Sequence, residues 1–287
     1  MTSSPTIRRA FATDLAAVTE FLAVRLAGAG GAARYLRILD YRWCADKPDL
    51  GVLVEDGGRI RGFIGAIYAD RPAGRFCNLT SIAVDEDYRR LTLQMFGALF
   101  RDKSLAFTCF SASEAVEAIL QFFKFQHWPN ERVVVGPPSG LRAVTRVGRV
   151  HVISDPGELD IQLRPDELAI ARDHRPYRCG ELLVVDGNRR CFVVTVRRGR
   201  GIRAFADVLY ASDPELLVGR LPWIHAPLFR AHHTLLTGID RRWVRLTPSL
   251  SFVYTKLRPT YVRAAGLDPT TIDALYSELV PISAVPS

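Results

Sequence analysis

The stretch that decides the fold reads Thr80-Ser-Ile-Ala-Val-Asp-Glu-Asp-Tyr88-Arg89-Arg90-Leu-Thr92-Leu-Gln94. Its apolar residues up to Val84 predict the end of a β-strand, and the acidic turn and arginine pair that follow lead into the first turn of a helix. The N-terminus of a helix carries unpaired backbone N–H groups and a positive dipole, so it can hold a phosphate without a dedicated side chain. This order of elements therefore predicts a phosphate site.

The elements around this stretch follow from hydrophobic spacing and turn residues. Leu15, Val18, Leu22 and Leu26 recur at three- and four-residue intervals, which predicts a helix with Thr13 at its N-cap. Asp56-Gly57-Gly58 predicts the turn of a β-hairpin. The other expected elements are a strand over 7–11, a helix over 32–43, the hairpin strands 50–55 and 59–70, a helix from 91, a strand over 105–110, a helix from Ser111 or Ser113, and a strand over 125–135.

The second half of the chain repeats the first. Asp186-Gly187 sits between two apolar runs as Asp56-Gly57 does, at an offset of 130 residues, and Asp213 follows a strand as Asp85 does, at an offset of 128. Pro137-Pro-Ser-Gly140 breaks the chain between the halves. We therefore expect two similar units, residues 1–140 and 141–287.

Composition is that of a globular protein of the reducing cytoplasm. The 287 residues are 48% hydrophobic and 24% charged, and nowhere do about 18 apolar residues run together as a membrane span requires. The five cysteines are odd in number and have neither CxxC nor disulfide-like spacing, and the first residues lack the pattern of an export signal. We expect no membrane span.

The net charge of +8 and a pI near 9.5 favour an acidic or phosphorylated partner, or simply a solvated arginine-rich surface. The densest cluster, Arg197 to Arg203, has no accompanying aromatic pattern of an RNA-binding sheet, so nucleic acid is the weaker alternative. His232 and His233 begin a predicted strand and point to opposite faces, so we expect no metal.

The order strand, helix, helix, hairpin, strand, helix, strand, helix over about residues 5–136 resembles the GNAT superfamily of acyl-CoA-dependent N-acyltransferases. In that family the pyrophosphate loop reads arginine or glutamine, two residues, glycine, one residue, glycine or alanine. Arg89 occupies the leading position here, and Thr92 and Gln94 replace the small residues. Further along, Ser113 stands for the family's asparagine, and Leu120 replaces its general-acid tyrosine.

The resemblance implies an α/β (α+β) fold of two tandem GNAT-like units, each a mixed, mostly antiparallel sheet flanked by helices. It implies acyl-CoA, foremost acetyl-CoA, as co-substrate bound by the first unit, while the second unit shapes the acceptor side or is structural. The acyl group would pass, from acyl-CoA or an acyl carrier protein, to an amine such as an amino sugar, an amino-acid derivative or a peptide. The alternative is a non-catalytic GNAT-like ligand-binding or scaffold protein that has lost CoA.

Site residues follow from the same resemblance. The backbone of residues 79–84 would hold the pantetheine arm and polarise the thioester carbonyl. The base that deprotonates the amine stays open among Asn78, Ser81 and Glu55, with Thr80 and Asp70 as further candidates. The expected donor contacts are Ile82, Ala83, Val84, Arg89, Arg90, Leu91, Thr92, Gln94 and Ser113. The expected acceptor contacts are Tyr35 and Trp43.

Overall fold

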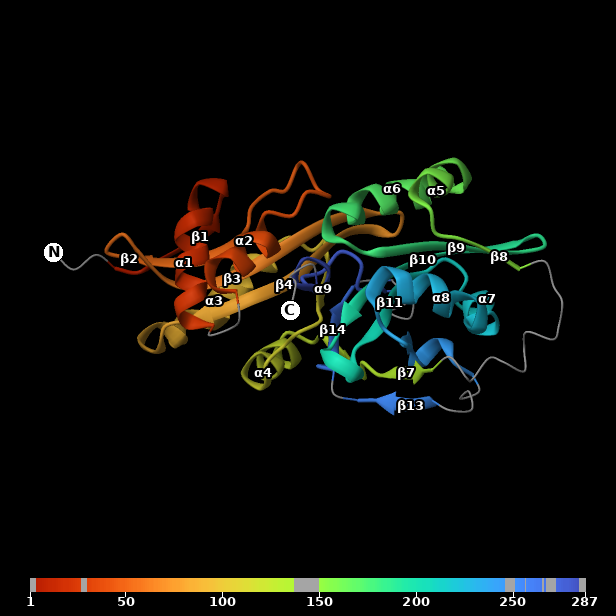
Figure 1. Ribbon diagram of the computed structural model, residues 1–287. Coiled ribbons are helices and arrows are strands. Elements are labelled where there is room, and N and C mark those ends of the chain that lie inside the picture. The colour runs from red at the N-terminus through yellow and green to blue at the C-terminus, as the bar shows by residue number, and fades with distance from the viewer. Residues whose placement is uncertain are drawn as a thin grey trace. The chain divides into compact units, whose positions relative to one another are not determined.

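The computed structural model describes residues 4–26, 30–136, 150–245, 251–255, 257–264, 266 and 272–283. They form two compact units, each built on one seven-stranded sheet (Figure 1). Unit 1 takes the described residues within 1–129, 258–272 and 276–285, and unit 2 takes those within 130–257 and 273–275. Among the described residues, no helix has the length and apolar character needed to cross a membrane.

In unit 1 the strand order is β1-β2-β3-β4-β5-β14-β6, and only the β4–β5 pair is parallel. The strands are β1 (Thr6–Ala10), β2 (Gly51–Asp56), β3 (Arg59–Arg71), β4 (Gly74–Val84), β5 (Ala106–Cys109), β14 (Thr260–Arg263) and β6 (Gln126–Trp128). The helices are α1 (Leu15–Arg25), α2 (Gly31–Leu39), α3 (Thr92–Leu99), α4 (Glu114–Phe122) and α9 (Leu279–Ser283), with the 3-10 helices η1 (Ala12–Asp14) and η2 (Glu86–Leu91).

In unit 2 the strand order is β13-β7-β12-β11-β10-β9-β8, and only the β11–β12 pair is parallel. The strands are β13 (Ser251–Tyr254), β7 (Arg132–Val135), β12 (Leu236–Asp240), β11 (Phe205–Ala211), β10 (Arg189–Arg198), β9 (Gly180–Asp186) and β8 (Val150–Ile153). The helices are α5 (Pro156–Gln162), α6 (Pro165–His174), α7 (Pro214–Gly219) and α8 (Leu221–His232), with the 3-10 helices η4 (Arg175–Tyr177), η5 (Gly201–Arg203) and η6 (Arg241–Trp243).

The predicted repeat is confirmed strand by strand. The parallel pair of unit 1 begins at Phe76↔Ala106, and that of unit 2 begins at Phe205↔Leu236. In both units the strand before the crossover carries a β-bulge against its hairpin partner. The sheets are thus mixed and mostly antiparallel, as expected.

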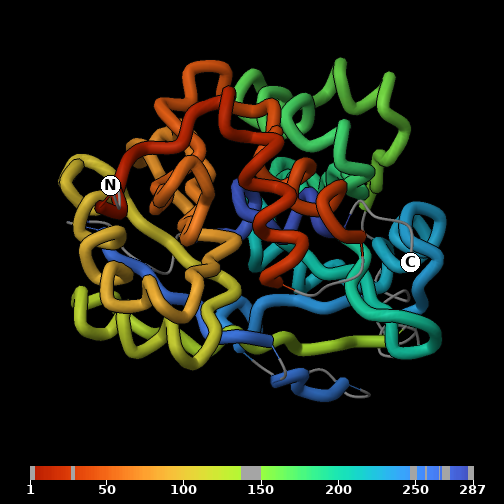
Figure 2. Tube along the Cα trace, turned by 90° about the vertical axis from the view of Figure 1, so that its left-hand side faces the viewer, coloured from red at the N-terminus to blue at the C-terminus, as the bar shows by residue number. Residues whose placement is uncertain are grey.

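The sheets do not follow the two halves of the sequence. β14 comes from the C-terminal part of the chain yet pairs with β5 and β6 in unit 1, and Figure 2 shows this blue segment beside the yellow strands. β7, expected in the first unit, pairs with β12 and β13 of unit 2. Each exchanged strand covers what would otherwise be an open sheet edge. The predicted boundary at Pro137–Gly140 lies outside the described residues.

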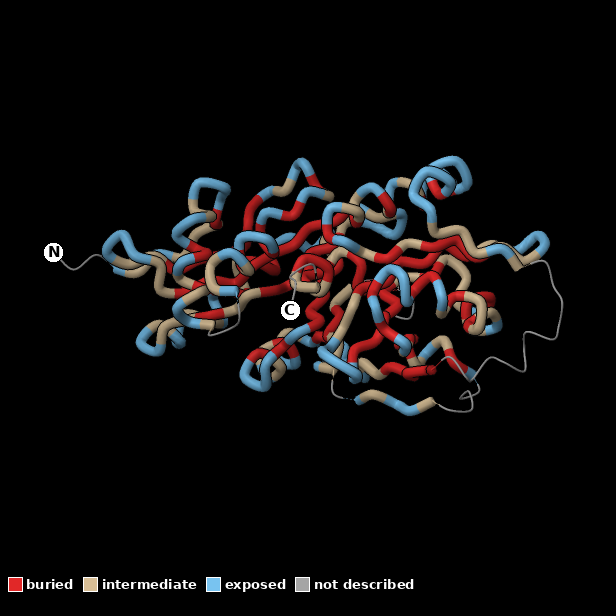
Figure 3. Tube along the Cα trace, in the orientation of Figure 1, coloured by how far each residue is buried: buried red, intermediate tan, exposed pale blue. Residues whose placement is uncertain are grey.

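The core of each unit lies along its central strands, which are buried in Figure 3, while turns and outer helix faces are exposed. In unit 1 the largest buried side chains include Phe63, Phe96 and Phe107, with Val18 and Leu22 of α1 packed into the same cluster. The spacing of Val18 and Leu22 is the spacing that predicted this helix.

Three expected element boundaries are wrong. The first helix begins at Leu15, because η1 precedes it and Asp14 rather than Thr13 occupies its N-cap. The second helix ends at Leu39 instead of Trp43. The single strand expected over 125–135 is two strands, because β6 and β7 join different sheets.

Candidate functional site

Strand β4, which leads into the predicted phosphate loop, extends beyond the end of its parallel partner, β5. β5 pairs with β4 only from Phe76↔Ala106 to Asn78↔Thr108, whereas β4 continues to Val84. Over residues 79–84 no described strand pairs with that edge of β4. At about 3.4 Å per residue, this edge is roughly 20 Å long. It can therefore take an extended ligand whose amide groups bond to backbone in the manner of an added strand.

A bulge bends β4 within this open stretch. The β3–β4 register shifts between Phe63 and Gly65, and Ser81 has φ +50°, in the left-handed region that a side chain disfavours. Gly65 permits the bulge, because a Cβ there would lie 2.8 Å from the carbonyl oxygen of Thr80. Strained backbone of this kind concentrates at ligand sites.

A buried polar cluster lies where β4 and β5 diverge. Asn78 accepts a hydrogen bond from the Thr108 hydroxyl at 3.1 Å, and its amide donates to the Glu278 carboxylate at 2.5 Å. The Ser111 hydroxyl donates to the other oxygen of Glu278. Asn78 and Glu278 are each 1% exposed, whereas Ser111 is exposed, so Ser111 connects the buried carboxyl to the surface.

Glu278 is the ionisable group of this cluster. Burial raises the pKa of its carboxyl above the ordinary value, and the hydrogen bonds from Ser111 and Asn78 oppose the rise. A buried carboxyl with a raised pKa and a hydroxyl leading to the surface suits proton transfer. No sequence pattern marked Glu278, because it lies 200 residues from Asn78 along the chain.

The three residues expected as bases are not equivalent. Asn78 belongs to the buried cluster, and Ser81 forms the bulge on the same strand. Glu55 lies on β2, which β3 separates from β4, and its carboxylate binds Arg8 at 2.8 Å. The structure therefore brings Asn78 and Ser81 to the open strand and assigns Glu55 to an ion pair elsewhere.

The predicted phosphate loop is a short helix rather than a tight turn. η2 starts at Glu86 and runs directly into α3, so the N–H of Thr92 donates to the carbonyl of Arg89. In this conformation the Thr92 N–H is therefore already hydrogen-bonded within the helix. Leu91 and Gln94 lie on the same helical path and Gln94 is exposed.

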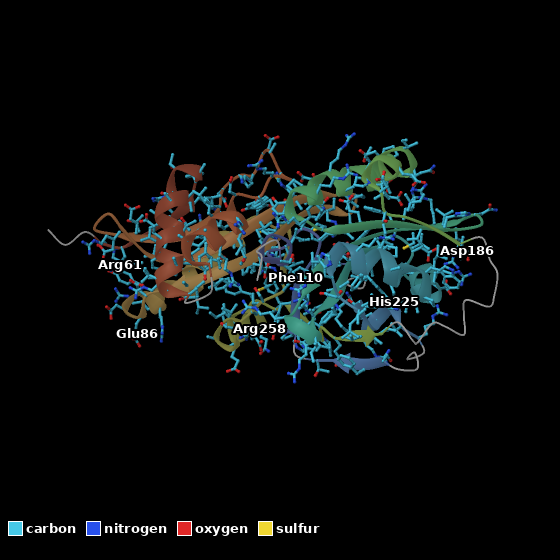
Figure 4. The ribbon with its side chains drawn as sticks, viewed as in Figure 1. Arg61, Glu86, Phe110, Asp186, His225 and Arg258 are labelled. Atoms are coloured by element: carbon cyan, nitrogen blue, oxygen red, sulfur yellow. The ribbon has the colours of Figure 1, made fainter. Side chains whose placement is uncertain are left out.

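The charges at this end of the site remain accessible. Arg89 and Arg90 are exposed, and the Arg89 guanidinium lies 3.7 Å from the carboxylate of Glu86. Figure 4 shows Glu86 and Arg61 near one end of unit 1, away from Phe110, which precedes Ser111 in the chain. The arginine pair and the Asn78–Glu278 cluster thus stand at opposite ends of the open edge of β4.

The remaining predicted ligand contacts, Ser113, Tyr35 and Trp43, form hydrogen bonds within the protein. Ser113 is the N-cap of α4, and its carbonyl accepts from the N–H of Glu117 at 2.8 Å. The Tyr35 hydroxyl donates to the carbonyl of Leu26 at 2.7 Å, and Tyr35 is 5% exposed. The Trp43 indole donates to the carbonyl of Tyr68 at 3.1 Å. Nothing in these contacts singles out Tyr35 or Trp43 for a substrate.

In unit 2 a buried ion pair occupies the position equivalent to Asn78. Asp207 takes the place of Asn78, since it is the last residue of β11 paired in parallel, opposite Gly238. Its fully buried carboxylate lies 2.6 Å from Arg132 and 2.7 Å from Arg198. An ion pair therefore occupies the place where unit 1 holds the Asn78–Glu278 cluster.

Comparison with solved structures finds this fold in GCN5-related N-acetyltransferases. One from Anabaena variabilis ATCC 29413 aligns with a TM-score of 0.57 at 7% identity, over 91% of this chain and 72% of that one. One from Kribbella flavida aligns with a TM-score of 0.52 at 12% identity, over 91% and 71%. The glucosamine N-acetyltransferase region of a fungal multi-domain GH3 β-N-acetylglucosaminidase aligns with a TM-score of 0.57 at 12% identity, over 91% and 38%.

No family profile matches the sequence, and neither does any curated protein. Structural similarity at identities this low shows the fold alone. The chain thus has the tandem GNAT fold that its element order predicted.

Proposed function

We propose that this protein is an N-acyltransferase that binds acyl-CoA along β4 of unit 1 and transfers the acyl group to an amine. The observation that carries the proposal is the open edge of β4 over residues 79–84, which ends beside the Asn78–Glu278 cluster. The pantetheine amides would bond to this edge, with the thioester near the cluster. Arg89 and Arg90 would meet the phosphates through their side chains.

Glu278 is the proposed proton acceptor. The acceptor's ammonium group would give its proton to the Ser111 hydroxyl as that hydroxyl passes its own proton to Glu278. The neutral amine would then attack the thioester carbonyl, the C–N bond would form as the C–S bond breaks, and the leaving CoA thiolate would take up the proton that the attacking nitrogen loses. Asn78 orients the carboxylate by its hydrogen bond and is a positioning residue.

Unit 1 is the proposed donor site because unit 2 holds Asp207 and Arg132 at the equivalent position. The acceptor class is a small amine, and an amino sugar is the first to test because one structural neighbour is described as a glucosamine N-acetyltransferase region. An acyl carrier protein is a further candidate donor, compatible with the net charge of +8.

The test is calorimetry with acetyl-CoA and longer acyl-CoAs, followed by acyl transfer to glucosamine, free amino acids and short peptides. Glu278→Gln should keep acyl-CoA affinity and lower kcat by about 10²–10⁴-fold, the usual contribution of a general base. Glu215→Gln, at an exposed carboxylate of unit 2, is the matched control and should change neither quantity.

Two results would contradict the proposal. Absence of acyl-CoA binding at millimolar concentration would leave the alternative, a GNAT-like protein without a donor, which the missing glycines and the occupied N–H of Thr92 favour. Unchanged affinity in the Arg89→Ala, Arg90→Ala double variant would remove the phosphates from this end of β4.

A further inference from the structure

Four neighbouring strands of unit 2 share one end of its sheet. β9 begins at Gly180 and β10 ends at Arg198, while β11 begins at Phe205 and β12 begins at Leu236. Arg198 pairs with Phe205, and Phe205 pairs with Leu236. Because adjacent strands lie about 4.8 Å apart, the four ends fall within roughly 15 Å. The residues that flank these ends form a surface that we call the arginine end of unit 2.

Helix α8 reaches the same surface with its last turn. The Nε2 atom of His232 lies 2.7 Å from the hydroxyl oxygen of Thr195 on β10. A Cβ atom at Gly180 would lie 3.2 Å from the Cβ of Ala231. Arg230, which is exposed and precedes Ala231, therefore belongs to the arginine end.

The arginines of this surface have no acidic partner. None of them pairs with a carboxylate among the residues that the structure describes, and all but the half-buried Arg197 are exposed; they are Arg178, Arg197, Arg200, Arg203 and Arg230. Two acids near these strand ends, Glu181 and Asp207, are already engaged by other arginines. The arginine end thus presents five guanidinium charges to a partner.

The opposite end of the same sheet neutralises its arginines. There Arg189 lies 2.8 Å from the carboxylate of Asp213, and Arg242 lies 2.7 Å from that of Asp240. Both arginines are adjacent to strand ends, as those of the arginine end are. The two ends of the sheet therefore differ in the pairing of their arginines and not merely in arginine content.

Two exposed aliphatic side chains stand among the unpaired arginines. Ile202 is 96% exposed in the turn between β10 and β11, and Leu235 is 63% exposed just before β12. Because Phe205 pairs with Leu236, these two turns are neighbours. A single exposed aliphatic residue is ordinary, but two on adjacent turns beside unpaired charges mark an interaction surface.

The turn that carries Ile202 has a defined shape. Gly199 and Gly201 have φ of +82° and +57°, in the left-handed region that glycine adopts without steric cost. A Cβ atom at Gly199 would lie 3.1 Å from the carbonyl oxygen of Arg203, so the two sides of the turn are packed closely. Ile202 is thus held at the tip of a compact turn, between Arg200 and Arg203.

Charge complementarity calls for an anionic partner, and the aliphatic tips decide its kind. Nucleic acid and phospholipid both offer phosphates, but single-stranded nucleic acid is held by aromatic side chains that stack on bases, and residues 197–204 contain none. A bilayer offers apolar acyl chains directly beneath its phosphates. Only the bilayer therefore has a place for Ile202 and Leu235 together with the arginines.

We propose that the arginine end of unit 2 binds the surface of an anionic phospholipid bilayer. The arginines meet the headgroup phosphates, and Ile202 and Leu235 enter the boundary between headgroups and acyl chains. Each arginine near such a surface strengthens binding about fivefold, and each inserted aliphatic side chain about tenfold or more. The surface needs neither acyl-CoA nor the Glu278 cluster, so it stands or falls separately from the proposed transferase activity.

The test is co-sedimentation of the full chain with vesicles of phosphatidylcholine alone or with 40% phosphatidylglycerol. The protein should sediment with the anionic vesicles at about millimolar lipid in low salt, and at least about tenfold less with the neutral ones. Binding should be largely lost in 0.5 M NaCl, because salt screens exposed charges. Retardation of mixed single-stranded RNA is measured at the same low salt.

Variants then assign the contacts. The Arg200→Gln, Arg203→Gln double variant should weaken vesicle binding about tenfold or more, and Ile202→Ser about tenfold. The matched controls are the Arg59→Gln, Arg101→Gln double variant, at exposed arginines of unit 1, and Ile161→Ser, at an isoleucine of α5 that is 82% exposed. Neither control should change vesicle binding more than about twofold.

Insertion is measured separately from adsorption. Lipids brominated near the headgroup should quench the added fluorescence of Ile202→Trp but not that of Ile161→Trp. All the substituted side chains are exposed, so each variant is expected to fold.

Four results would overturn the proposal. They are no sedimentation with anionic vesicles at millimolar lipid in low salt, equal binding to neutral vesicles, equal losses in the variants and their controls, and equal quenching of the two tryptophans. Retardation of RNA that Ile202→Ser leaves unchanged, without vesicle binding, would assign the arginine end to nucleic acid instead.

Discussion

Arg132→Met should destabilise unit 2 strongly, because it removes one partner of a buried ion pair. The Arg132 side chain is 5% exposed, and its Nε lies 2.6 Å from the fully buried carboxylate of Asp207. Burial alone would lower the pKa of Arg132, but the carboxylates of Asp207 and Asp240 outweigh it and keep the guanidinium charged. The guanidinium thus carries its charge within the sheet.

The magnitude follows from what the substitution leaves behind. Breaking a buried pair by removing one partner costs about 3–5 kcal/mol, most of it from the uncompensated charge. Arg198 still binds the second oxygen of Asp207 at 2.7 Å, which puts the expected loss near the lower end, about 3 kcal/mol. Methionine keeps an aliphatic stem of similar length, so packing contributes little to the change.

Urea unfolding by circular dichroism, with hydrogen exchange resolved over β7, β11 and β12, measures the loss in unit 2 separately from unit 1. The matched control is Arg189→Met, since Arg189 is 51% exposed and pairs with Asp213 at the surface. Surface pairs contribute about 0–1 kcal/mol. A loss below about 1 kcal/mol in Arg132→Met, or one equal to the control, would refute the reasoning.

Two further predictions concern backbone strain and pH. Ser81→Gly should raise the free energy of unfolding by up to about 1 kcal/mol, because glycine adopts φ +50° without steric cost, and a lowered Tm would contradict this. Burial, helped by the charges of Arg197 and His233, lowers the pKa of His232 from 6.5 to about 4. Between these values the unfolded chain binds a proton that the native protein excludes. The free energy of unfolding should therefore fall by up to about 3 kcal/mol as the pH drops from 6.5 to 4, as measured by urea titration. The His232→Gln variant should lack this pH-dependent loss.

The parts of the fold that were predicted correctly are those encoded by local patterns. The hairpin turn at Gly57-Gly58 needs two residues with positive φ, and both glycines have it, at +57° and +71°. The helix expected from Ser111 or Ser113 is α4, and Ser113 is its N-cap. Ser111, the other expected cap, instead donates its hydroxyl to Glu278.

The candidate site was only partly predictable. Asn78 and Ser81 could be placed on the right strand, because strand and loop order follow from periodicity. Phosphate binding at the loop stays a prediction, and the sequence did not show that the helical path beginning at Glu86 pairs the Thr92 N–H internally. Whether the helical path starts at Glu86 or six residues later, at Thr92, depends on tertiary packing, which a single sequence does not display.

The sequence by itself determined the repeated unit, its hairpins and the strand that ends beside the arginine pair, because two- and 3.6-residue periodicities are properties of neighbouring residues. Only the tertiary structure decided which strand completes which sheet and which acid lies against Asn78. β14 and Glu278 both return to unit 1 from the end of the chain. Such pairings arise where an open sheet edge and a buried polar group meet the partners that satisfy them, however distant those partners are in sequence.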